Sequence, residues 1–181
     1  MVYTIISYVA SFFALVIIMY SYFANNKKYY LLYQCLGIIC LITSYLFISR
    51  YFATISMLVA LIRTLTFGIF EYKNKIAPIF YSYLFVFLTI LTYFIINVIY
   101  LKIFSWLDIL HVIALCFYAF TFRIRNLKKM RRVILMPNVL EVLYNLIMFA
   151  PLFTTLSYLF ELLSNVVAIC RFDLKKEKKK V

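Results

Sequence analysis

Short polar stretches divide the chain into seven apolar runs, each close to the ~20 residues that a helix needs to cross about 30 Å of hydrocarbon. The runs cover approximately residues 3–23, 30–48, 51–70, 78–100, 104–122, 133–150 and 152–171. Strands of a membrane barrel would alternate between apolar and polar residues, whereas these runs are continuous. The pattern therefore predicts an all-α integral membrane protein with seven transmembrane helices.

The composition excludes a water-soluble domain. Of the 181 residues, 67% are hydrophobic and 14% are charged, whereas about a quarter of the residues of a typical soluble domain are charged. A small domain also keeps much of its surface exposed, so it has no room to bury so many apolar side chains. The first run is too long for the core of a cleaved signal peptide and follows no basic segment, so we expect it to be retained.

The positive charge is segregated between the two sets of connections. One set carries the basic residues Lys27, Lys28, Lys73, Lys75, Arg123, Arg125, Lys128, Lys129, Arg131, Arg132 and the segment Lys175–Lys180, and the other carries only Arg50 and Lys102. Because Lys and Arg mark cytoplasmic loops, seven crossings with the N-terminus outside and the C-terminus inside are predicted. The net charge of +13 is then topological, and we expect anionic lipids, not nucleic acid, at these cytoplasmic loops.

A segment of the third run is echoed in the seventh run. Residues 56–63 and 164–171 share Ser, Val, Ala and Arg at the same spacing. An odd number of runs lies between them, so the two segments point in the same direction. We therefore predict two parallel three-helix repeats, at about 3–72 and 104–172, joined by a linker helix at about 78–100 and followed by a basic cytoplasmic tail, 173–181. Parallel repeats recur in transporters, where the substrate binds between the halves near the middle of the membrane.

Several short segments also occur in the order found in a known family. They are Lys27–Gln34, Leu61–Arg63, Phe70–Lys75, Pro137 with Tyr144–Asn145, and Ser164–Asp173. Together they resemble the YgjV family of bacterial inner-membrane proteins over about residues 25–173. The resemblance implies a location in the bacterial inner membrane and a fold similar to the SWEET and PQ-loop architecture of two three-helix bundles plus a linker helix. It implies a fold rather than an activity.

Two carboxylates interrupt the last two runs. Glu141 lies about eight residues from the cytoplasmic end of its run and Glu161 about nine residues from the outer end of the next, so at ~1.5 Å per residue both lie near mid-membrane. An ionised side chain there costs at least ~2.5–3.5 kcal/mol. The pair suits a proton-coupled site or a pocket that recognises a cation; the alternative is a protonated Glu that forms an interhelical hydrogen bond as part of the packing.

Other polar residues extend this candidate substrate site. Asn145 and Asn165 follow the two glutamates by one helical turn and so share their faces. The two polar stripes either line a cavity or form a hydrogen-bonded seam. Arg63 lies deep in the third run, and we favour an arginine that snorkels to the inner headgroups; the alternative is an interior partner for an anion or a carboxylate.

Asp108 and His111 are three residues apart near the outer end of the fifth run. Histidine titrates near neutral pH, so this pair is a candidate for proton access or sensing. The alternative is an ion pair at the membrane interface beside Trp106, which is typical of a headgroup anchor.

The sequence lacks the residues that a metal site, a phosphate-binding loop or an enzyme active site would need. The four cysteines form no CxxC pair and the chain has one histidine, so no metal site, disulfide framework or cofactor is predicted. Gly37 and Gly68 are too few for phosphate-binding loops, and no nucleophile–base pair indicates an enzyme. Two functions remain. One is a SWEET-like small-solute transporter with proton coupling. The other is a non-transporting scaffold or subunit of a larger membrane complex, and the scarcity of Gly and Pro favours this second function.

Candidate partners are the bilayer, a small-molecule substrate and a second copy of the chain.

Overall fold

The computed structural model describes residues 2–47, 51–102, 106–147 and 152–174. The helices are α1 (Val2–Tyr22), α2 (Lys27–Phe47), α3 (Tyr51–Tyr72), α4 (Ile79–Tyr93) with the π-helix η1 (Phe94–Tyr100), α5 (Trp106–Thr121), α6 (Leu127–Ile147), and α7 (Leu152–Ala168) with the π-helix η2 (Ile169–Leu174). No strand occurs in these ranges, which confirms the predicted all-α class. The joints at 48–50 and 148–151 and the basic tail 175–181 lie outside the described residues.

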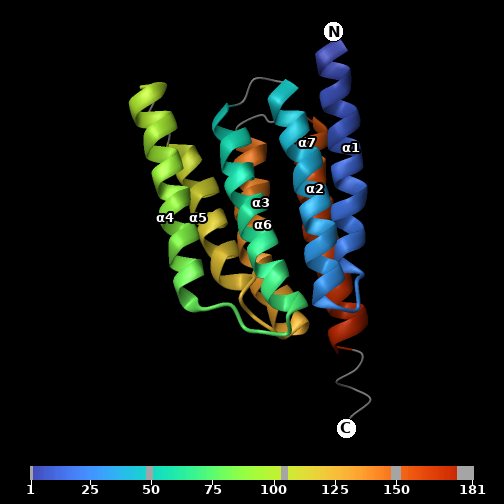
Figure 1. The fold of residues 1–181 in the computed structure, drawn as a ribbon. Coiled ribbons are helices and arrows are strands. Elements are labelled where there is room, and N and C mark those ends of the chain that lie inside the picture. The colour runs from blue at the N-terminus through green and yellow to red at the C-terminus, as the bar shows by residue number, and fades with distance from the viewer. Residues whose placement is uncertain (1, 48–50, 103–105, 148–151, 175–181) are drawn as a thin grey trace.

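The helices form one bundle, with the N-terminus and the C-terminus at opposite ends (Figure 1). Each helix contacts the next one along the chain, and α7 also packs against α1, so the bundle closes into a ring. Helix α4 lies at one edge of the bundle (Figure 1), where it contacts both α3 and α5. A closed ring has an inner face on every helix, and polar side chains on those faces can meet.

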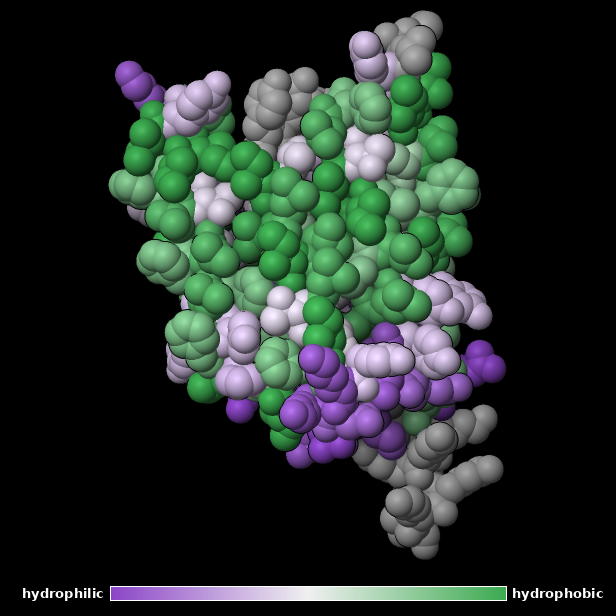
Figure 2. All heavy atoms as spheres, viewed as in Figure 1, coloured by the Kyte–Doolittle hydropathy of each residue, from purple (hydrophilic) through white to green (hydrophobic). Residues whose placement is uncertain are grey.

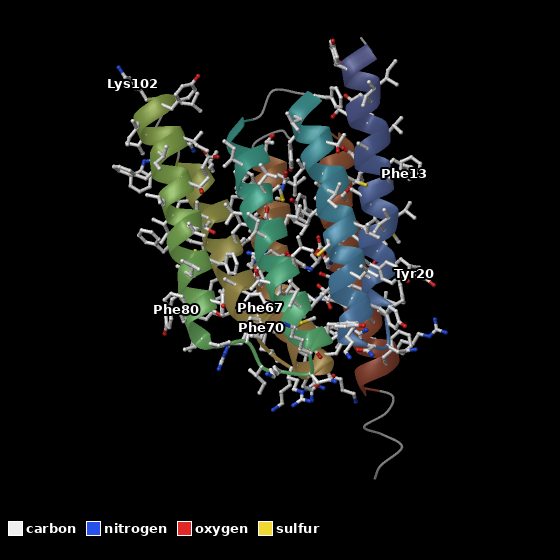
Figure 3. The ribbon with its side chains drawn as sticks, in the orientation of Figure 1. Phe13, Tyr20, Phe67, Phe70, Phe80 and Lys102 are labelled. Atoms are coloured by element: carbon white, nitrogen blue, oxygen red, sulfur yellow. The ribbon has the colours of Figure 1, made fainter. Side chains whose placement is uncertain are left out.

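The face of the molecule in Figure 2 is apolar around the middle of the bundle and strongly polar at the end near the C-terminus. Phe13 and Tyr20 of α1 and Phe80 of α4 point away from the bundle, whereas Lys102 lies at the opposite end from the basic cluster (Figure 3). So large an exposed apolar surface would be unfavourable in water. Lipid is therefore the solvent of this surface.

Five of the described helical segments are long and apolar enough to cross a membrane. They are Tyr3–Tyr22, Lys27–Phe47, Ala53–Tyr72, Ile79–Tyr100 and Thr155–Phe172. Helix α5 is apolar but has 16 residues. Helix α6 has 21 residues but begins with a strongly basic segment, Lys128–Arg132.

Helices α2 and α6 begin before the apolar runs that predicted them, because an asparagine caps each one. The Asn126 Oδ1 accepts hydrogen bonds from the backbone N–H groups of Lys128 and Lys129, at 3.0 and 3.4 Å. Asn26 accepts one from Lys28 at 3.1 Å. Such caps satisfy backbone donors in the first turn of a helix. The basic residues therefore belong to the helix, and the start at 133 that the apolar run indicates is wrong for α6.

The first and second halves of the bundle share local details. The turn after α1 contains a hydrogen bond from Ala24 N to Ser21 O, and the turn after α5 contains the matching bond from Ile124 N to Thr121 O, at 3.1 and 3.0 Å. The buried positions also recur. In α2 and α6 the matching buried residues are Tyr30 and Met130, Leu31 and Arg131, Gln34 and Ile134, Ile38 and Asn138, and Leu41 and Glu141. In α3 and α7 they are Ser56 and Ser157, Met57 and Tyr158, Ala60 and Glu161, Arg63 and Ser164, and Thr64 and Asn165.

The burial pattern has a different register from that of the sequence echo. The echo aligns Arg63 with Arg171, but Arg63 is buried and Arg171 is exposed. The burial pattern instead aligns Arg63 with Ser164, two helical turns earlier. A shift of two turns keeps a residue on nearly the same helix face, so the sequence alone could not separate the two registers.

Candidate functional site

A cavity of about 40 Å³ lies inside the ring of helices. Its lining comes from α1, α2, α3, α5, α6, α7 and the residue after α5, and consists of Ile18, Gln34, Ile38, Leu41, Met57, Ala60, Arg63, Leu115, Tyr118, Phe122, Glu141, Tyr158 and Glu161. A water molecule needs ~10–15 Å³ of such space, so the cavity has room for about three waters. Three of the predicted site residues, Arg63, Glu141 and Glu161, therefore line one cavity.

Arg63 faces the interior, so the interpretation that it snorkels to the headgroups is wrong; its role as a partner for an anion or a carboxylate stays a prediction. Its side chain is 4% exposed, and its Nη1 donates a 2.7 Å hydrogen bond to the carbonyl oxygen of Leu115. The guanidinium carbon lies 5.4 Å from the ring centre of Tyr118 and 5.2 Å from that of Phe122, within the range of cation–π attraction. In the described structure its Nε makes no hydrogen bond.

Glu161 is the acceptor at the end of a hydrogen-bonded network of phenols. The hydroxyl of Tyr22 donates to Glu161 Oε1 at 2.6 Å, and the same hydroxyl accepts from Tyr30 at 3.3 Å and from Asn138 Nδ2 at 3.2 Å. The Tyr118 hydroxyl donates to Asn138 Oδ1. The network joins α1, α2, α5, α6 and α7 around one side of the cavity, and its buried polar groups are satisfied by one another.

Glu141 contacts His111 across the α5–α6 interface. The His111 Nδ1 lies 2.8 Å from one carboxylate oxygen of Glu141 and 2.9 Å from the other. Glu141 is 1% exposed and His111 is 2% exposed. Lipid and protein exclude water from this pair, so its electrostatic interaction is far less screened than a surface ion pair.

Asp108 belongs to the same polar cluster through other residues. Its carboxylate accepts hydrogen bonds from Asn97 Nδ2 at 2.7 Å and from the Tyr144 hydroxyl at 2.9 Å. The Tyr144 ring stacks on the imidazole of His111 at 5.0 Å. Asn97 lies in the π-helix η1, and such segments are frequent at functional sites. The spacing of Asp108 and His111 gave no indication of either Asn97 or Tyr144.

Asn145 and Asn165 are buried but are not among the residues that line the cavity. The Asn145 Nδ2 donates to the Glu141 carbonyl oxygen at 2.8 Å, within its own helix. The Asn165 Nδ2 donates to the Arg131 carbonyl oxygen at 3.0 Å, which ties α7 to α6. The two glutamates thus line the cavity, whereas the hydrogen bond of Asn165 crosses the α6–α7 interface and that of Asn145 stays within α6.

Arg131 is the main interior residue that the sequence did not reveal. It is 3% exposed, and its Nη2 donates hydrogen bonds of 2.7 Å to the carbonyl oxygens of Tyr22 and Ala24. A cation at the C-terminal end of α1 is favourable because the last carbonyls of a helix carry partial negative charge. Its spacing from Ile134, Asn138 and Glu141 along one helix face was the signal that could have separated it from the neighbouring loop cations.

The described residues contain no group of three or more His, Cys, Asp or Glu side chains that could hold a metal ion. Cys35, Cys40, Cys116 and Cys170 are free thiols. The chemistry of the described interior therefore rests on several phenols and on buried ionisable residues, namely Arg63, Arg131, Asp108, His111, Glu141 and Glu161.

A ring of helices with an apolar exterior and ionisable residues inside defines an integral membrane protein. The chain belongs to the family described as bacterial inner membrane protein, Imp-YgjV, whose family model matches residues 5–176. The resemblance noted from the sequence is thereby confirmed, together with the location in the bacterial inner membrane. No curated protein and no solved structure matches the chain.

Proposed function

We propose that this protein carries a small solute across the bacterial inner membrane and binds it in the central cavity beside Arg63, Glu141 and Glu161. The observation that carries the proposal is the concentration of one cationic and two acidic side chains around a cavity inside an apolar bundle. Each costs at least ~2.5–3.5 kcal/mol at the centre of a span. Apolar residues often replace buried ionic groups without loss of stability, so folding alone does not explain them.

Unsatisfied polar atoms at the cavity favour a ligand site over a scaffold. Within the described residues the Arg63 Nε and the Tyr158 hydroxyl, both of residues that line the cavity, make no hydrogen bond. A buried hydrogen bond left unmade costs ~1–3 kcal/mol, which is recovered when a solute or a water binds there. A non-transporting scaffold or subunit of a larger complex, the alternative, needs binding residues on its surface and gains nothing from such a cavity.

The architecture that we infer is two parallel three-helix units, α1–α3 and α5–α7, linked by α4. The recurrent buried positions and the matching turns after α1 and α5 support a tandem repeat. The contacts of α4 with both α3 and α5 suit a linker. The cavity then lies between the units, and rocking of one unit against the other would open it to each side in turn.

Pro137 is a candidate hinge for this movement. It lies inside α6, about one turn before Glu141, and is buried. Proline lacks the backbone N–H that would bond to the carbonyl four residues earlier, so a helix bends most easily there. The scarcity of helix-breaking residues, which favoured a scaffold, therefore has less weight, because one of the few prolines lies beside the site.

We further propose that transport is coupled to protons through His111 and Glu141. A proton shared in their contact of 2.8–2.9 Å can move between imidazole and carboxylate as the site opens. Asp108 and Tyr144 lie beside them, toward the outer end of α5, so these residues extend the polar path from the cavity toward that end.

Seven crossings, with the N-terminus outside and the C-terminus inside, complete the proposal. Ends of the chain at opposite ends of the bundle support an odd number of crossings (Figure 1). The basic residues gather at the C-terminal end (Figure 2), as cytoplasmic loops do, and anionic lipids are the partners that we expect there.

Solute uptake by the purified protein in reconstituted vesicles tests the function. A panel of metabolites is offered with and without an inward proton gradient to wild type, to the double variant Glu141→Gln, Glu161→Gln, and to Glu71→Gln as a matched control outside the cavity. We expect uptake above empty vesicles for wild type and for the control, stimulation by the gradient, and loss in the double variant. Wild-type vesicles that match empty ones over the whole panel would favour the scaffold, and uptake indifferent to the gradient would remove the proton coupling.

A further inference from the structure

The charges around the cavity are divided between its two walls. Arg63 comes from α3, in the first half of the chain, whereas Glu141 and Glu161 come from α6 and α7, in the second half. Glu71 forms an ion pair with Lys27 at 3.0 Å and Glu141 forms one with His111 at 2.8 Å. Arg63 and Glu161 line the same cavity from the two halves of the chain, and among the described residues neither has an ion-pair partner within 4.0 Å.

The contacts of Arg63 leave one edge of its guanidinium available to bind a carboxylate. Its Nη1 is engaged by the Leu115 carbonyl oxygen, and its Nε makes no hydrogen bond in the described structure. A carboxylate binds an arginine bidentately along the edge formed by Nε and the other terminal nitrogen, with two parallel charge-assisted hydrogen bonds. The rings of Tyr118 and Phe122 hold the guanidinium plane in place.

The side of the cavity that carries Glu161 suits an ammonium group. Glu161 accepts a hydrogen bond from Tyr22 through Oε1 and interacts with the side chain of Gln34, and an ionised carboxylate has room for further donors. The Tyr158 hydroxyl has no hydrogen-bond partner in the described structure and also lines the cavity, so it offers a further acceptor. An ammonium group carries three donors and would satisfy these oxygens.

From this arrangement we propose that the solute is a small zwitterion with one carboxylate and one ammonium group, as in an α-amino acid. The inference rests on the proposed transport function and names its substrate class. A cation or an anion alone would leave one wall with an unpaired buried charge, and a sugar would leave both. The cavity of about 40 Å³ and its apolar lining by Ile18, Leu41, Met57 and Leu115 restrict the solute to a short apolar side chain or none.

Uptake of labelled glycine and alanine into vesicles that contain the full-length protein tests the substrate class. Three compounds of similar size compete: glycolate has only the carboxylate, ethanolamine has only the ammonium group, and ethylene glycol has neither. We expect glycine uptake well above empty vesicles, and competition by alanine at least about tenfold more effective than by any of the three. Transport of glycolate, ethanolamine or a sugar in place of glycine would overturn the zwitterion while leaving transport intact. Absence of any uptake over the metabolite panel would overturn both.

Variants assign the two walls. Arg63→Gln is expected to reduce glycine uptake at least about tenfold, and Arg63→Lys to restore part of it, because lysine keeps the charge but lacks the planar fork. Glu161→Gln is expected to weaken competition by ethanolamine more than competition by glycolate. Arg125→Gln, on the exposed cytoplasmic loop, serves as the matched control and should keep wild-type uptake.

A binding measurement separates loss of the site from loss of the fold. Glycine is expected to raise the unfolding midpoint of the detergent-purified wild type and of Arg125→Gln, but not that of Arg63→Gln. A variant that retains a cooperative transition but gains no stability from glycine has lost the site alone. If glycine stabilises Arg63→Gln as much as wild type, Arg63 is not the carboxylate partner and the inference fails.

Discussion

The hydroxyl of Tyr22 donates a 2.6 Å hydrogen bond to Glu161, which joins the last residue of α1 to the middle of α7. The backbone carbonyl oxygen of the same tyrosine accepts a 2.7 Å hydrogen bond from Arg131 of α6. Tyr22 thus connects the cavity wall with the basic end of the bundle. A movement that releases Glu161 from Tyr22 would also loosen the contact between α1 and α6.

Removal of this one hydroxyl tests how much the contact stabilises the bundle. Tyr22→Phe removes the hydroxyl that donates to Glu161 and accepts from Tyr30 and Asn138, and we expect the free energy of unfolding to fall by ~1–3 kcal/mol. Thermal unfolding in detergent measures the change. Tyr29→Phe is the matched control, because Tyr29 is 58% exposed on α2 and its loss of a hydroxyl should be almost neutral. Equal unfolding midpoints for the two variants would show that the hydrogen bond contributes little.

The two glycines of the chain provide a second matched pair. A Cβ added at Gly37 of α2 would lie 2.4 Å from the Cγ1 of Ile18 on α1, whereas one added at Gly68 of α3 meets nothing within 4 Å. Gly37→Ala should therefore force the α1–α2 contact apart and destabilise the protein by ~1–3 kcal/mol. Gly68→Ala should be neutral or stabilise by up to ~1 kcal/mol, because alanine favours a helix over glycine. The prediction fails if Gly37→Ala unfolds at the same temperature as Gly68→Ala.

The contact between His111 and Glu141 predicts energetic coupling. In a double-mutant cycle with His111→Gln and Glu141→Gln, each single change leaves one buried partner alone, so the double variant should lose less stability than the two single losses added together. We expect a coupling energy of ~0.5–3 kcal/mol, measured from thermal unfolding. Additive losses would mean that the two groups do not interact. A second cycle, with Glu71→Gln in place of Glu141→Gln, should be additive. Glu71 lies at the C-terminal end of α3, where its ion-pair partner is Lys27.

The sequence predicted the helices well because lipid leaves the chain little choice. A backbone in hydrocarbon must satisfy its own hydrogen bonds, so every long apolar run becomes a helix. The helix ends were less predictable, because water and headgroups tolerate polar residues within a helix. At α6 the cap by Asn126 sets the start, and the basic residues that separate the apolar runs form the first turns.

The candidate site was predictable in its residues but not in its pairs. Glu141, Glu161 and Arg63 attracted attention because ionisable groups are costly in a span, and all three line the cavity. Local spacing drew attention to Asp108 beside His111, but it did not indicate that Glu141 lies within hydrogen-bonding distance of the imidazole. That contact depends on how α5 packs against α6, and spacing along one helix does not determine such packing. The inward direction of Arg63 was detectable, since Ser56, Ala60 and Thr64 share its face and are small or polar.

The number of crossings depends on α5 and α6, which are not among the five segments that are long and apolar enough to cross a membrane, and α5 is the shorter of the two. Its 16 residues span about 24 Å at ~1.5 Å per residue, which is shorter than the ~30 Å hydrocarbon core. We expect it to cross nonetheless, with its ends exposed to thinned or headgroup-rich regions of the bilayer. Single cysteines in place of Lys102, before α5, and Lys129, after it, test this in a background without the four native cysteines. An impermeant maleimide should label Lys102→Cys in intact cells and Lys129→Cys only after permeabilisation.

A third position makes the labelling pattern decisive. Lys73 is exposed in the loop before α4, so Lys73→Cys should behave like Lys129→Cys. If Lys73→Cys is protected and both other positions are labelled, α4 crosses and α5 does not, and the second basic cluster would lie outside the cell. Such a result would contradict the segregation of positive charge and would leave α5–α7 unable to form a unit parallel to α1–α3. The expected pattern, with only Lys102→Cys labelled, requires α4 and α5 both to cross, which is what a linker helix between two parallel units demands.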